Sequence, residues 1–262
     1  MRHKRHVARF GWIPDLPDQR DFAFSAPRAI LRKLPAKTNL TAKCPPVFDQ
    51  GELGSCTANA IGAAIEFDLM KQRLRRFMPS RLFIYYNERV MENTVNEDSG
   101  AMIRDGIKSV AKQGVCPEKM WPYDPQPYPP NPRLTKKPTH PCYGEALKHT
   151  AIQYQRISRN LSQMKGCLAS GYPFVIGFTV YDSFESDEVA RTGEMPMPSP
   201  RESVIGGHAV LAVGYDDSEA RFRMRNSWGT KWGMKGYFTM PYAYLLDENL
   251  SDDFWQITLI KG

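Results

Sequence analysis

The chain has 262 residues, of which 42% are hydrophobic and 24% are charged. These are ordinary values for a folded globular protein, and they exclude a disordered tail, a collagen-like fibre and a coiled coil. Its 35 lysines and arginines exceed its 28 aspartates and glutamates, giving a net charge of +7. An excess this small, spread along the chain, favours solubility rather than a nucleic-acid partner. The length suits one large domain or two closely packed lobes.

The sequence predicts neither a membrane span nor a secretory leader. No run approaches the ~18 consecutive apolar residues that a span needs, and the basic N-terminus lacks the apolar segment of ~7–15 residues that defines a signal peptide. Five cysteines without a CxxC pair do not suggest a disulfide framework; they are Cys44, Cys56, Cys116, Cys142 and Cys167. We therefore expect folding in a reducing compartment, either the cytoplasm or, after export by a non-classical route, a destination such as a virion.

Residues 1–33 are expected to form an N-terminal extension. Three prolines with charged residues between them argue against a long helix there. Trp12 and Phe22 are the side chains expected to pin this segment to the folded body. The sequence leaves open whether the extension is a short propeptide that covers a cleft and is removed, or an arm packed on the back of the body.

The strongest helical pattern follows Cys56. Small and apolar residues recur there at three- and four-residue spacing, and Ser55 is a candidate N-cap. Further helices are predicted around Ser80–Glu92 and Met102–Gln113, the second ended by a glycine. Residues of about 50–120 are therefore predicted to form a helical lobe.

A proline-rich connection separates this lobe from the rest of the chain. Nine of the 25 residues from 117 to 141 are proline, which excludes a regular element. Beyond it, apolar runs bounded by glycine and aspartate predict strands: Phe174–Tyr181, His208–Tyr215, Arg221–Asn226 and Gly236–Met240. The predicted fold class is α+β, with a β-rich lobe over about residues 142–262.

Three short segments carry residues suited to acyl transfer. Cys56 opens the predicted helix, where the helix dipole and free amides lower a thiol pKa and favour the thiolate. His208, at the start of a strand in the other lobe, can pair with that thiolate and protonate a leaving amine. Asn226 can orient the imidazole, and Gln50 with the Cys56 amide can bind the oxyanion of a tetrahedral intermediate. The sequence therefore predicts cysteine-based acyl transfer with its partners on different lobes.

The order of Gln50, Cys56, His208 and Asn226 resembles that of the papain-like cysteine peptidases, family C1, over roughly residues 34–262. Two longer motifs carry the resemblance: His-Ala-Val-x-x-x-Gly-Tyr from His208 and Asn-Ser-Trp-Gly-x-x-Trp-Gly from Asn226. The resemblance implies a papain-like two-lobe fold with a barrel-like C-terminal lobe and the active-site cleft between the lobes. It also implies that these four residues are catalytic.

The resemblance further implies a set of substrate-binding residues: Ser99, Gly100, Gly207 and Trp228. The tryptophan matches the one that shields the bond between the family's histidine and asparagine from water. Because Gly207 brings no charge, an apolar substrate side chain is expected in the pocket beside it, with Ala101 and Met102 as walls.

Two residues that depart from the family pattern indicate which branch of the family the chain resembles. Leu53 stands where the family usually has a cysteine that joins a nearby disulfide, which agrees with a reducing compartment. Thr57 replaces the tryptophan that usually follows the nucleophile, so the cleft wall is smaller and more polar there. This pattern resembles a bacterial or viral-type branch.

The predicted function is therefore a thiol endopeptidase that hydrolyses peptide or protein substrates through a thioester acyl-enzyme, as a monomer. No cofactor is expected, and no His/Cys cluster has the spacing of metal ligands. No nucleic-acid partner is expected either. Two alternatives stay open: transfer of the acyl group to an amine, as in a transglutaminase, or a non-catalytic binding module that keeps the fold.

Overall fold

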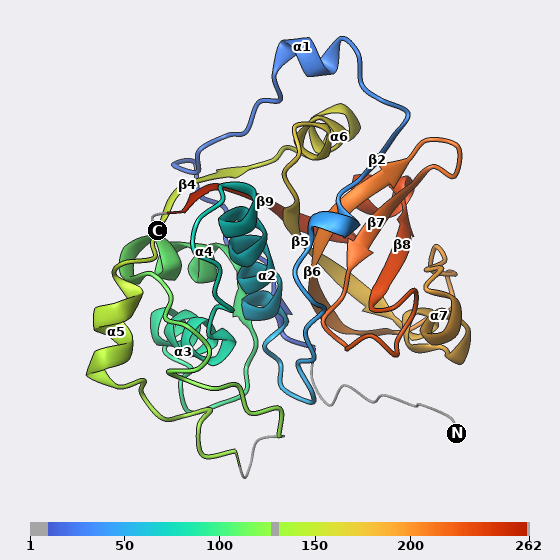
Figure 1. Ribbon diagram of the computed structural model, residues 1–262. Helices are drawn as coiled ribbons and strands as arrows, with labels where there is room; N and C mark the ends of the chain where they lie inside the picture. The colour runs from blue at the N-terminus through green and yellow to red at the C-terminus, as the bar shows by residue number, and fades with distance from the viewer. Residues whose placement is uncertain (1–9, 127–130, 261–262) are drawn as a thin grey trace.

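A computed structural model describes residues 10–126 and 131–260, which form a helical lobe beside a β-rich lobe (Figure 1). The fold class is α+β, as the sequence predicts. The helices of the first half lie on one side of the molecule, and a seven-stranded sheet lies on the other. None of the described helices is long and apolar enough to cross a membrane.

The central helix, α2 (Cys56–Lys71), packs against both lobes. Every residue from Cys56 to Leu69 is buried, because small side chains such as Ala60 and Ala63 let neighbouring elements approach closely. Ser55 occupies the predicted N-cap position, but its hydroxyl makes no capping hydrogen bond, and its oxygen instead lies 2.5 Å from the Tyr123 hydroxyl. Cys56 therefore opens a helix that is enclosed on all sides.

Two further helices flank α2 where the sequence predicts them. α3 (Arg81–Glu92) begins after Ser80, whose hydroxyl accepts a hydrogen bond from the Phe83 amide. α4 (Ile103–Gln113) ends at Gly114, whose φ of 73° favours glycine. These caps explain why both helices begin and end close to their predicted bounds.

The proline-rich connection forms no helix in its described part before α5 (His140–Ala146), and residues 127–130 lie outside the described structure. Short helices elsewhere, which the sequence did not predict, are too short to show a periodic pattern. They are α1 (Arg28–Leu31), η1 (Thr41–Lys43), α6 (Leu161–Ala169), η2 (Asp182–Glu185), α7 (Asp187–Thr192) and α8 (Tyr242–Leu246).

The sheet has the strand order β4-β9-β5-β6-β7-β8, with β2 also paired to β6, and its pairings are antiparallel. Four strands confirm predictions: β5 (Phe174–Tyr181), β6 (Val204–Asp216), β7 (Arg221–Arg225) and β8 (Tyr237–Pro241). Three were missed: β2 (Lys37–Asn39), β4 (Ala151–Arg156) and β9 (Ser251–Ile260). β6 packs against α2 and so joins the two lobes.

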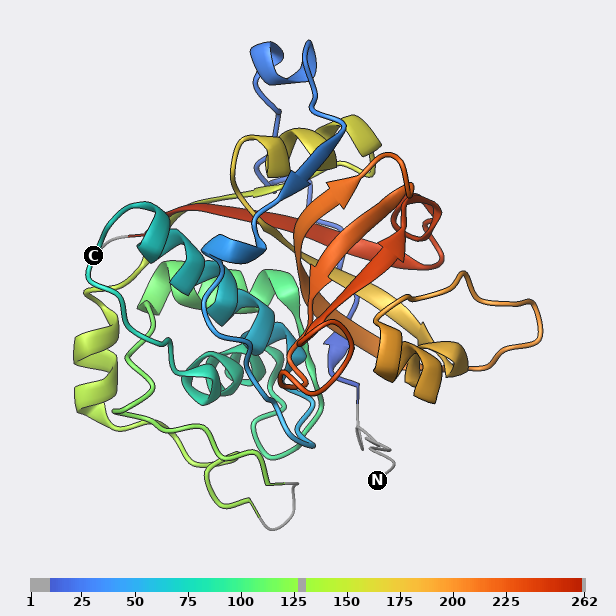
Figure 2. The same cartoon turned by 45° about the vertical axis from the view of Figure 1, so that its right-hand side comes forward.

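The described part of the N-terminal extension starts between the lobes (Figure 2). There β1 (Trp12–Ile13) pairs in parallel with β3 (Ala101–Met102) and packs against β5 and β6. Trp12 is only 8% exposed, whereas Phe22 is 68% exposed. The prediction that both aromatic side chains pin the segment is therefore right for Trp12 and wrong for Phe22.

Candidate active site

Cys56, the candidate nucleophile, is fully buried where α2 meets the β-rich lobe. Its sulfur is within hydrogen-bonding reach of the Ala209 amide on β6. Because Ala209 directly follows His208 in the sequence, the fold brings the candidate nucleophile and the candidate base into neighbouring positions.

His208 is held by two side chains from the segment after β7. Its Nε2 lies 2.8 Å from Asn226 Oδ1, and since that oxygen can only accept, Nε2 carries the proton. The Trp228 indole stacks on the imidazole, with 4.9 Å between ring centroids and 28° between planes. The Nδ1 atom is buried and has no hydrogen-bond partner among the residues that the structure describes. Nδ1 is therefore the atom available to a neighbouring thiol.

Gln50 connects the loop before α2 with the same segment. Its Nε2 donates to the Leu53 carbonyl at 2.9 Å, and its Oε1 accepts from the Ser227 hydroxyl at 2.5 Å. Its backbone amide also donates to the Ser227 carbonyl, at 2.8 Å. An amide nitrogen has two hydrogens, so Gln50 Nε2 keeps one for a further acceptor.

Burial keeps the candidate thiol and imidazole in their neutral forms. It raises the pKa of the Cys56 thiol to about 12, against the lowering effect of nearby backbone amides. It also lowers the pKa of His208 to about 4, although the hydrogen bond to Asn226 acts in the opposite sense. The lowered thiol pKa expected at a helix N-terminus is therefore wrong for this conformation, because lost hydration outweighs the helix dipole.

The N-terminal segment covers the candidate nucleophile. The Gly11 amide is within hydrogen-bonding reach of the Cys56 sulfur, and the Gly11 carbonyl accepts a 2.7 Å hydrogen bond from Ala101. A Cβ atom on Gly11 would lie 1.6 Å from the Gly54 carbonyl oxygen, and one on Gly100 would lie 2.3 Å from the Gly11 carbonyl oxygen. Glycine is thus required on both sides of this close backbone approach.

Aromatic rings of the same segment pack against the candidate base and the β-rich lobe. The Phe10 ring centroid is 6.2 Å from that of His208. The Trp12 indole lies against β5 and β6, where a Cβ atom on Gly177 or Gly207 would come within 2.0 Å or 2.8 Å of its ring carbons. We call residues 10–21 the covering arm.

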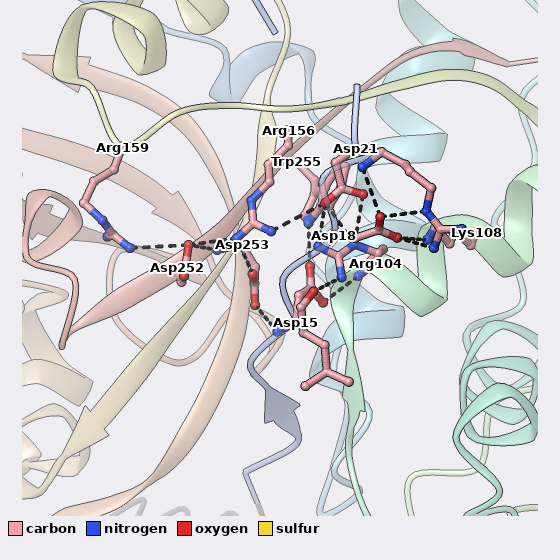
Figure 3. A network of polar contacts seen from close by, with 12 residues as sticks. Asp15, Asp18, Asp21, Arg104, Lys108, Arg156, Arg159, Asp252, Asp253 and Trp255 are labelled. Carbon is pink, nitrogen blue, oxygen red and sulfur yellow. Dashed lines mark hydrogen bonds and ion pairs between the residues drawn. The ribbon is translucent and has the colours of Figure 1, made fainter. Parts of the chain in front are cut away.

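Buried charges anchor the covering arm farther along its length (Figure 3). Arg104 of α4 forms an ion pair of 2.5 Å with Asp21, and both side chains are less than 10% exposed. The Arg104 amide donates to Asp15 Oδ1 at 3.0 Å, and the Trp255 indole of β9 donates to Asp15 Oδ2 at 2.9 Å. Since α4 and β9 belong to different lobes, the arm is clamped from both sides.

Asp98 links the loop before α2 to the segment around Gly100. Its carboxylate accepts hydrogen bonds from the Gly54 amide, at 3.0 and 3.1 Å, and from the Tyr85 hydroxyl, at 2.6 Å. The Tyr85 hydroxyl in turn accepts from the Gly100 amide at 3.0 Å. These contacts tie the loop before α2 to the strip around Gly100, next to Leu53, which occupies the position of the family's disulfide cysteine.

The predicted substrate-binding residues have different surroundings. Gly100 and Gly207 lie against the covering arm, and Trp228 stacks on the imidazole. The Ser99 hydroxyl instead donates to Thr94 Oγ1 at 2.8 Å, so its side chain stabilises its own loop.

Sequence reasoning missed two acidic residues near the candidate active site. Asp98 directly precedes the predicted Ser99 strip, and that adjacency was its one signal. Asp253 accepts a hydrogen bond from the Trp12 indole at 3.0 Å, but it lies on β9, which the sequence did not predict. Among residues 10–126 and 131–260, no group of three or more His, Cys, Asp or Glu is placed to hold a metal ion.

Comparisons with known proteins define the class. A family model described as papain family cysteine protease matches residues 34–245. The chain therefore belongs to the papain family, and it is a cysteine peptidase by class.

Individual relatives come from a virus, a bacterium and a plant. An uncharacterized peptidase C1-like protein of Acanthamoeba polyphaga mimivirus is 44% identical over 95% of this chain and 86% of its own length. The crystal structure of xylellain, a cysteine protease from Xylella fastidiosa, is similar with a TM-score of 0.90 and 48% identity, covering 95% of each chain. Chymopapain from Carica papaya is 27% identical over 74% of this chain and 51% of its own. The resemblance to a bacterial or viral-type branch is thus confirmed.

Proposed function

We propose that the chain hydrolyses peptide bonds with Cys56 as nucleophile, His208 as acid and base, Asn226 as the group that orients His208, and Gln50 in the oxyanion hole. One observation carries the proposal. The Ala209 amide reaches the Cys56 sulfur while the preceding imidazole is held through Nε2 by Asn226. This arrangement leaves Nδ1 free to exchange a proton with the thiol.

The reaction starts when Nδ1 of His208 takes the thiol proton and the Cys56 sulfur attacks the carbonyl carbon of the scissile bond. The oxyanion accepts hydrogen bonds from the Cys56 amide and from the remaining Nε2 hydrogen of Gln50. The imidazolium then protonates the departing amine as the carbon–nitrogen bond breaks, which leaves a thioester. His208 next takes a proton from water, the hydroxide attacks the thioester, and the sulfur leaves and regains its proton.

We further propose that the described conformation is latent. Gly11 lies over the Cys56 sulfur and between Gly54 and Gly100, so a substrate carbonyl cannot reach the thiol while the covering arm is bound. The extension over residues 1–33 thus acts in part as a cover for the cleft rather than as an arm on its back. Departure of the arm rehydrates the thiol and imidazole and returns both pKa values toward their ordinary range.

A set of full-length variants tests the proposal. Trp12→Ala removes the largest buried side chain of the arm and is expected to increase hydrolysis of a peptide substrate. Adding Cys56→Ala is expected to abolish that hydrolysis, whereas adding Cys167→Ala, at a buried cysteine on α6, is expected to preserve it. Hydrolysis that survives Cys56→Ala would rule out the mechanism, and a product mass showing a new amide would indicate transfer to an amine.

The bound arm also favours one alternative, a non-catalytic binding module whose cleft stays covered. An epoxide inhibitor that alkylates activated thiols separates the two. If Cys56 in the Trp12→Ala variant reacts with the epoxide and hydrolyses peptides, the chain is an enzyme. If Cys56 stays unreactive although the arm has been displaced, the binding module is the better account.

A further inference from the structure

Two of the five cysteines contact each other in the helical lobe. The sulfur atoms of Cys116 and Cys142 are within hydrogen-bonding reach of one another, and both residues are buried, with 0% and 1% of their surface exposed. Cys44 and Cys167 instead contact backbone carbonyl oxygens, each at 3.5 Å. The fold therefore brings together two thiols that are separated in the sequence by the 25 residues from 117 to 141.

The backbone around Cys116 is held on both sides. Its carbonyl accepts a hydrogen bond of 2.9 Å from the Ser80 amide, next to the start of α3. The preceding amide, that of Val115, donates at 3.0 Å to the carbonyl of His149, just beyond the end of α5. Cys116 is thus fixed between α3 and the chain that continues from α5, the helix that carries Cys142.

Cys142 lies in the first turn of α5 and faces the interior of the lobe. Cys142 and Ala146 are the buried residues of this helix. The Cys142 sulfur lies 3.2 Å from the Thr139 hydroxyl oxygen and 3.6 Å from the Met120 carbonyl oxygen. Because the two sulfur atoms are already in contact, a short approach brings them to the ~2.05 Å that separates the sulfurs of a disulfide.

Burial makes these thiols slow to react. It raises the pKa of the Cys116 thiol, and the neighbouring Cys142 raises that pKa further. Since the thiolate is the attacking species in disulfide exchange, the reaction waits for a local opening of the lobe or takes place while the chain folds. The same burial then shields a finished bridge from reductants.

A bridge between these residues closes the proline-rich connection into a loop. The described part of this connection contacts the candidate active site: the Tyr123 hydroxyl donates to the Gln50 carbonyl at 2.8 Å, and the Pro125 carbonyl accepts from the Glu52 amide at 3.3 Å. Closing a loop of about 25 residues restricts the unfolded chain and so favours the folded one. The bridge would therefore stabilise the segment that supports the loop before α2.

We propose that Cys116 and Cys142 are a site of oxidative modification, at which an intramolecular disulfide forms when the chain meets a small-molecule disulfide of the glutathione class. The pairing depends on contacts across the helical lobe, so the absence of a CxxC pair, from which the sequence analysis argued against a disulfide framework, does not reveal it. Neither thiol belongs to the candidate active site, and the inference does not depend on the proposed function.

The chemistry balances between the chain and the small disulfide. The thiolate of one cysteine attacks a sulfur of the small disulfide, and the first small thiolate leaves. The thiolate of the other cysteine then attacks the protein sulfur of this mixed disulfide, and the second small thiolate leaves. The chain loses two electrons and two protons, and the small disulfide gains them and becomes two thiols.

The test equilibrates the full-length chain with mixtures of glutathione disulfide and glutathione, in the folded state and in guanidinium. The folded state is reached both by direct incubation and by dilution from guanidinium, so that slow access to the thiols does not hide the reaction. Remaining thiols are blocked, and peptides are identified by mass spectrometry. The equilibrium constant for joining Cys116 to Cys142 should be about 100-fold or more larger in the folded chain than in guanidinium.

Matched variants identify the pair. Cys116→Ala and Cys142→Ala should each abolish the joined peptide, whereas Cys167→Ala, at an equally buried cysteine, should leave its yield unchanged. The bridged wild-type chain should also melt roughly 5–10 °C above the reduced chain, and this difference should vanish in Cys142→Ala. No joined peptide by either route, equal equilibrium constants in the folded and unfolded states, or another partner for Cys116 in the main product would each overturn the proposal.

Discussion

The two ends of the covering arm are held by different kinds of contact. Over the thiol, Phe10 and Gly11 make ring and backbone contacts, and the groups they cover are neutral. Farther along, Asp15 and Asp21 are held by buried ion pairs and hydrogen bonds (Figure 3). The blocking end and the anchoring end are thus separate, so one can be weakened without changing the other.

The largest expected change in peptide hydrolysis comes from weakening the anchoring end of the covering arm. Arg104→Ala removes the nearer arginine partner of the buried Asp21 carboxylate and leaves it the longer 3.6 Å contact with Arg156. Breaking a buried ion pair costs about 3–5 kcal/mol. Since each ~1.4 kcal/mol is a factor of ten, the arm should open and peptide hydrolysis by the full-length chain should rise ~100-fold or more. Lys108→Ala is the matched control on α4, because its 3.4 Å contact with Asp18 is partly exposed and should change the rate little.

The second prediction concerns Asp98, which holds the loop that carries the thiol beneath the blocking end of the arm. Asp98→Ala leaves the Gly54 amide and the Tyr85 hydroxyl without their acceptor, at a cost of about 1–3 kcal/mol each. In the Trp12→Ala chain, kcat/KM should fall ~10- to 100-fold, mainly through kcat, because the loop that carries the thiol is no longer fixed against the Gly100 strip. Tyr85→Phe should produce a smaller loss. An unchanged kcat in Asp98→Ala would show that the loop is positioned without this carboxylate.

The pH dependence of arm binding should reveal two opposing groups, one at each end. Burial and the neighbouring Asp15 raise the pKa of Asp253 to about 7 from 3.8. Between these pH values the carboxyl group of Asp253 is therefore protonated while the arm covers it and ionised once the arm has left. Falling pH therefore strengthens binding through Asp253. Burial lowers the pKa of His208 to about 4 from 6.5. Between these pH values the imidazole is therefore neutral while the arm covers it and protonated once the arm has left. Falling pH therefore weakens binding through His208.

Since these shifts are opposite in sign, the two groups should offset one another in part in the wild-type chain between pH 4 and pH 6.5. Asp253→Asn should make the arm open as pH falls from 6.5 to 4, and His208→Gln should make it bind more tightly as pH falls from 7 to 4. Hydrogen exchange of the arm amides, corrected for intrinsic rates, measures both. Parallel profiles for the two variants would contradict the assignment of opposing groups.

The smallest effect is expected where the sequence-based prediction was wrong. Phe22 is 68% exposed, so Phe22→Ser should change neither peptide hydrolysis nor the rate of thiol labelling. Trp12→Ala at the other aromatic position should change both. Equal effects of these two substitutions would show that the arm is held mainly outside the cleft.

The sequence predicted those features whose signals are local. α2, α3 and the strands β5 to β8 follow from periodicity and caps, and Cys56 and His208 follow from motifs within a few residues of each. β9 was missed because Asp252, Asp253 and Gln256 interrupt its apolar pattern. Only the folded chain brings its carboxylate to a tryptophan 241 residues away.

The position of the covering arm could not be predicted from the sequence either. Gly11 fits between Gly54 and Gly100 through backbone contacts that no pattern of residues encodes. The same long-range packing raises the pKa of Cys56, whereas the sequence predicts a lowered one. A helix N-terminus lowers a thiol pKa only while water or a charged partner remains nearby.

The rate at which an epoxide inhibitor labels Cys56, followed by mass spectrometry of the intact chain, tests the central claim most directly. The full-length wild-type chain should be labelled slowly. Arg104→Ala and Trp12→Ala should be labelled much faster, at Cys56 alone among the five cysteines. Equally rapid labelling of the wild type and both variants would contradict the account, because it would mean that the arm does not cover the thiol.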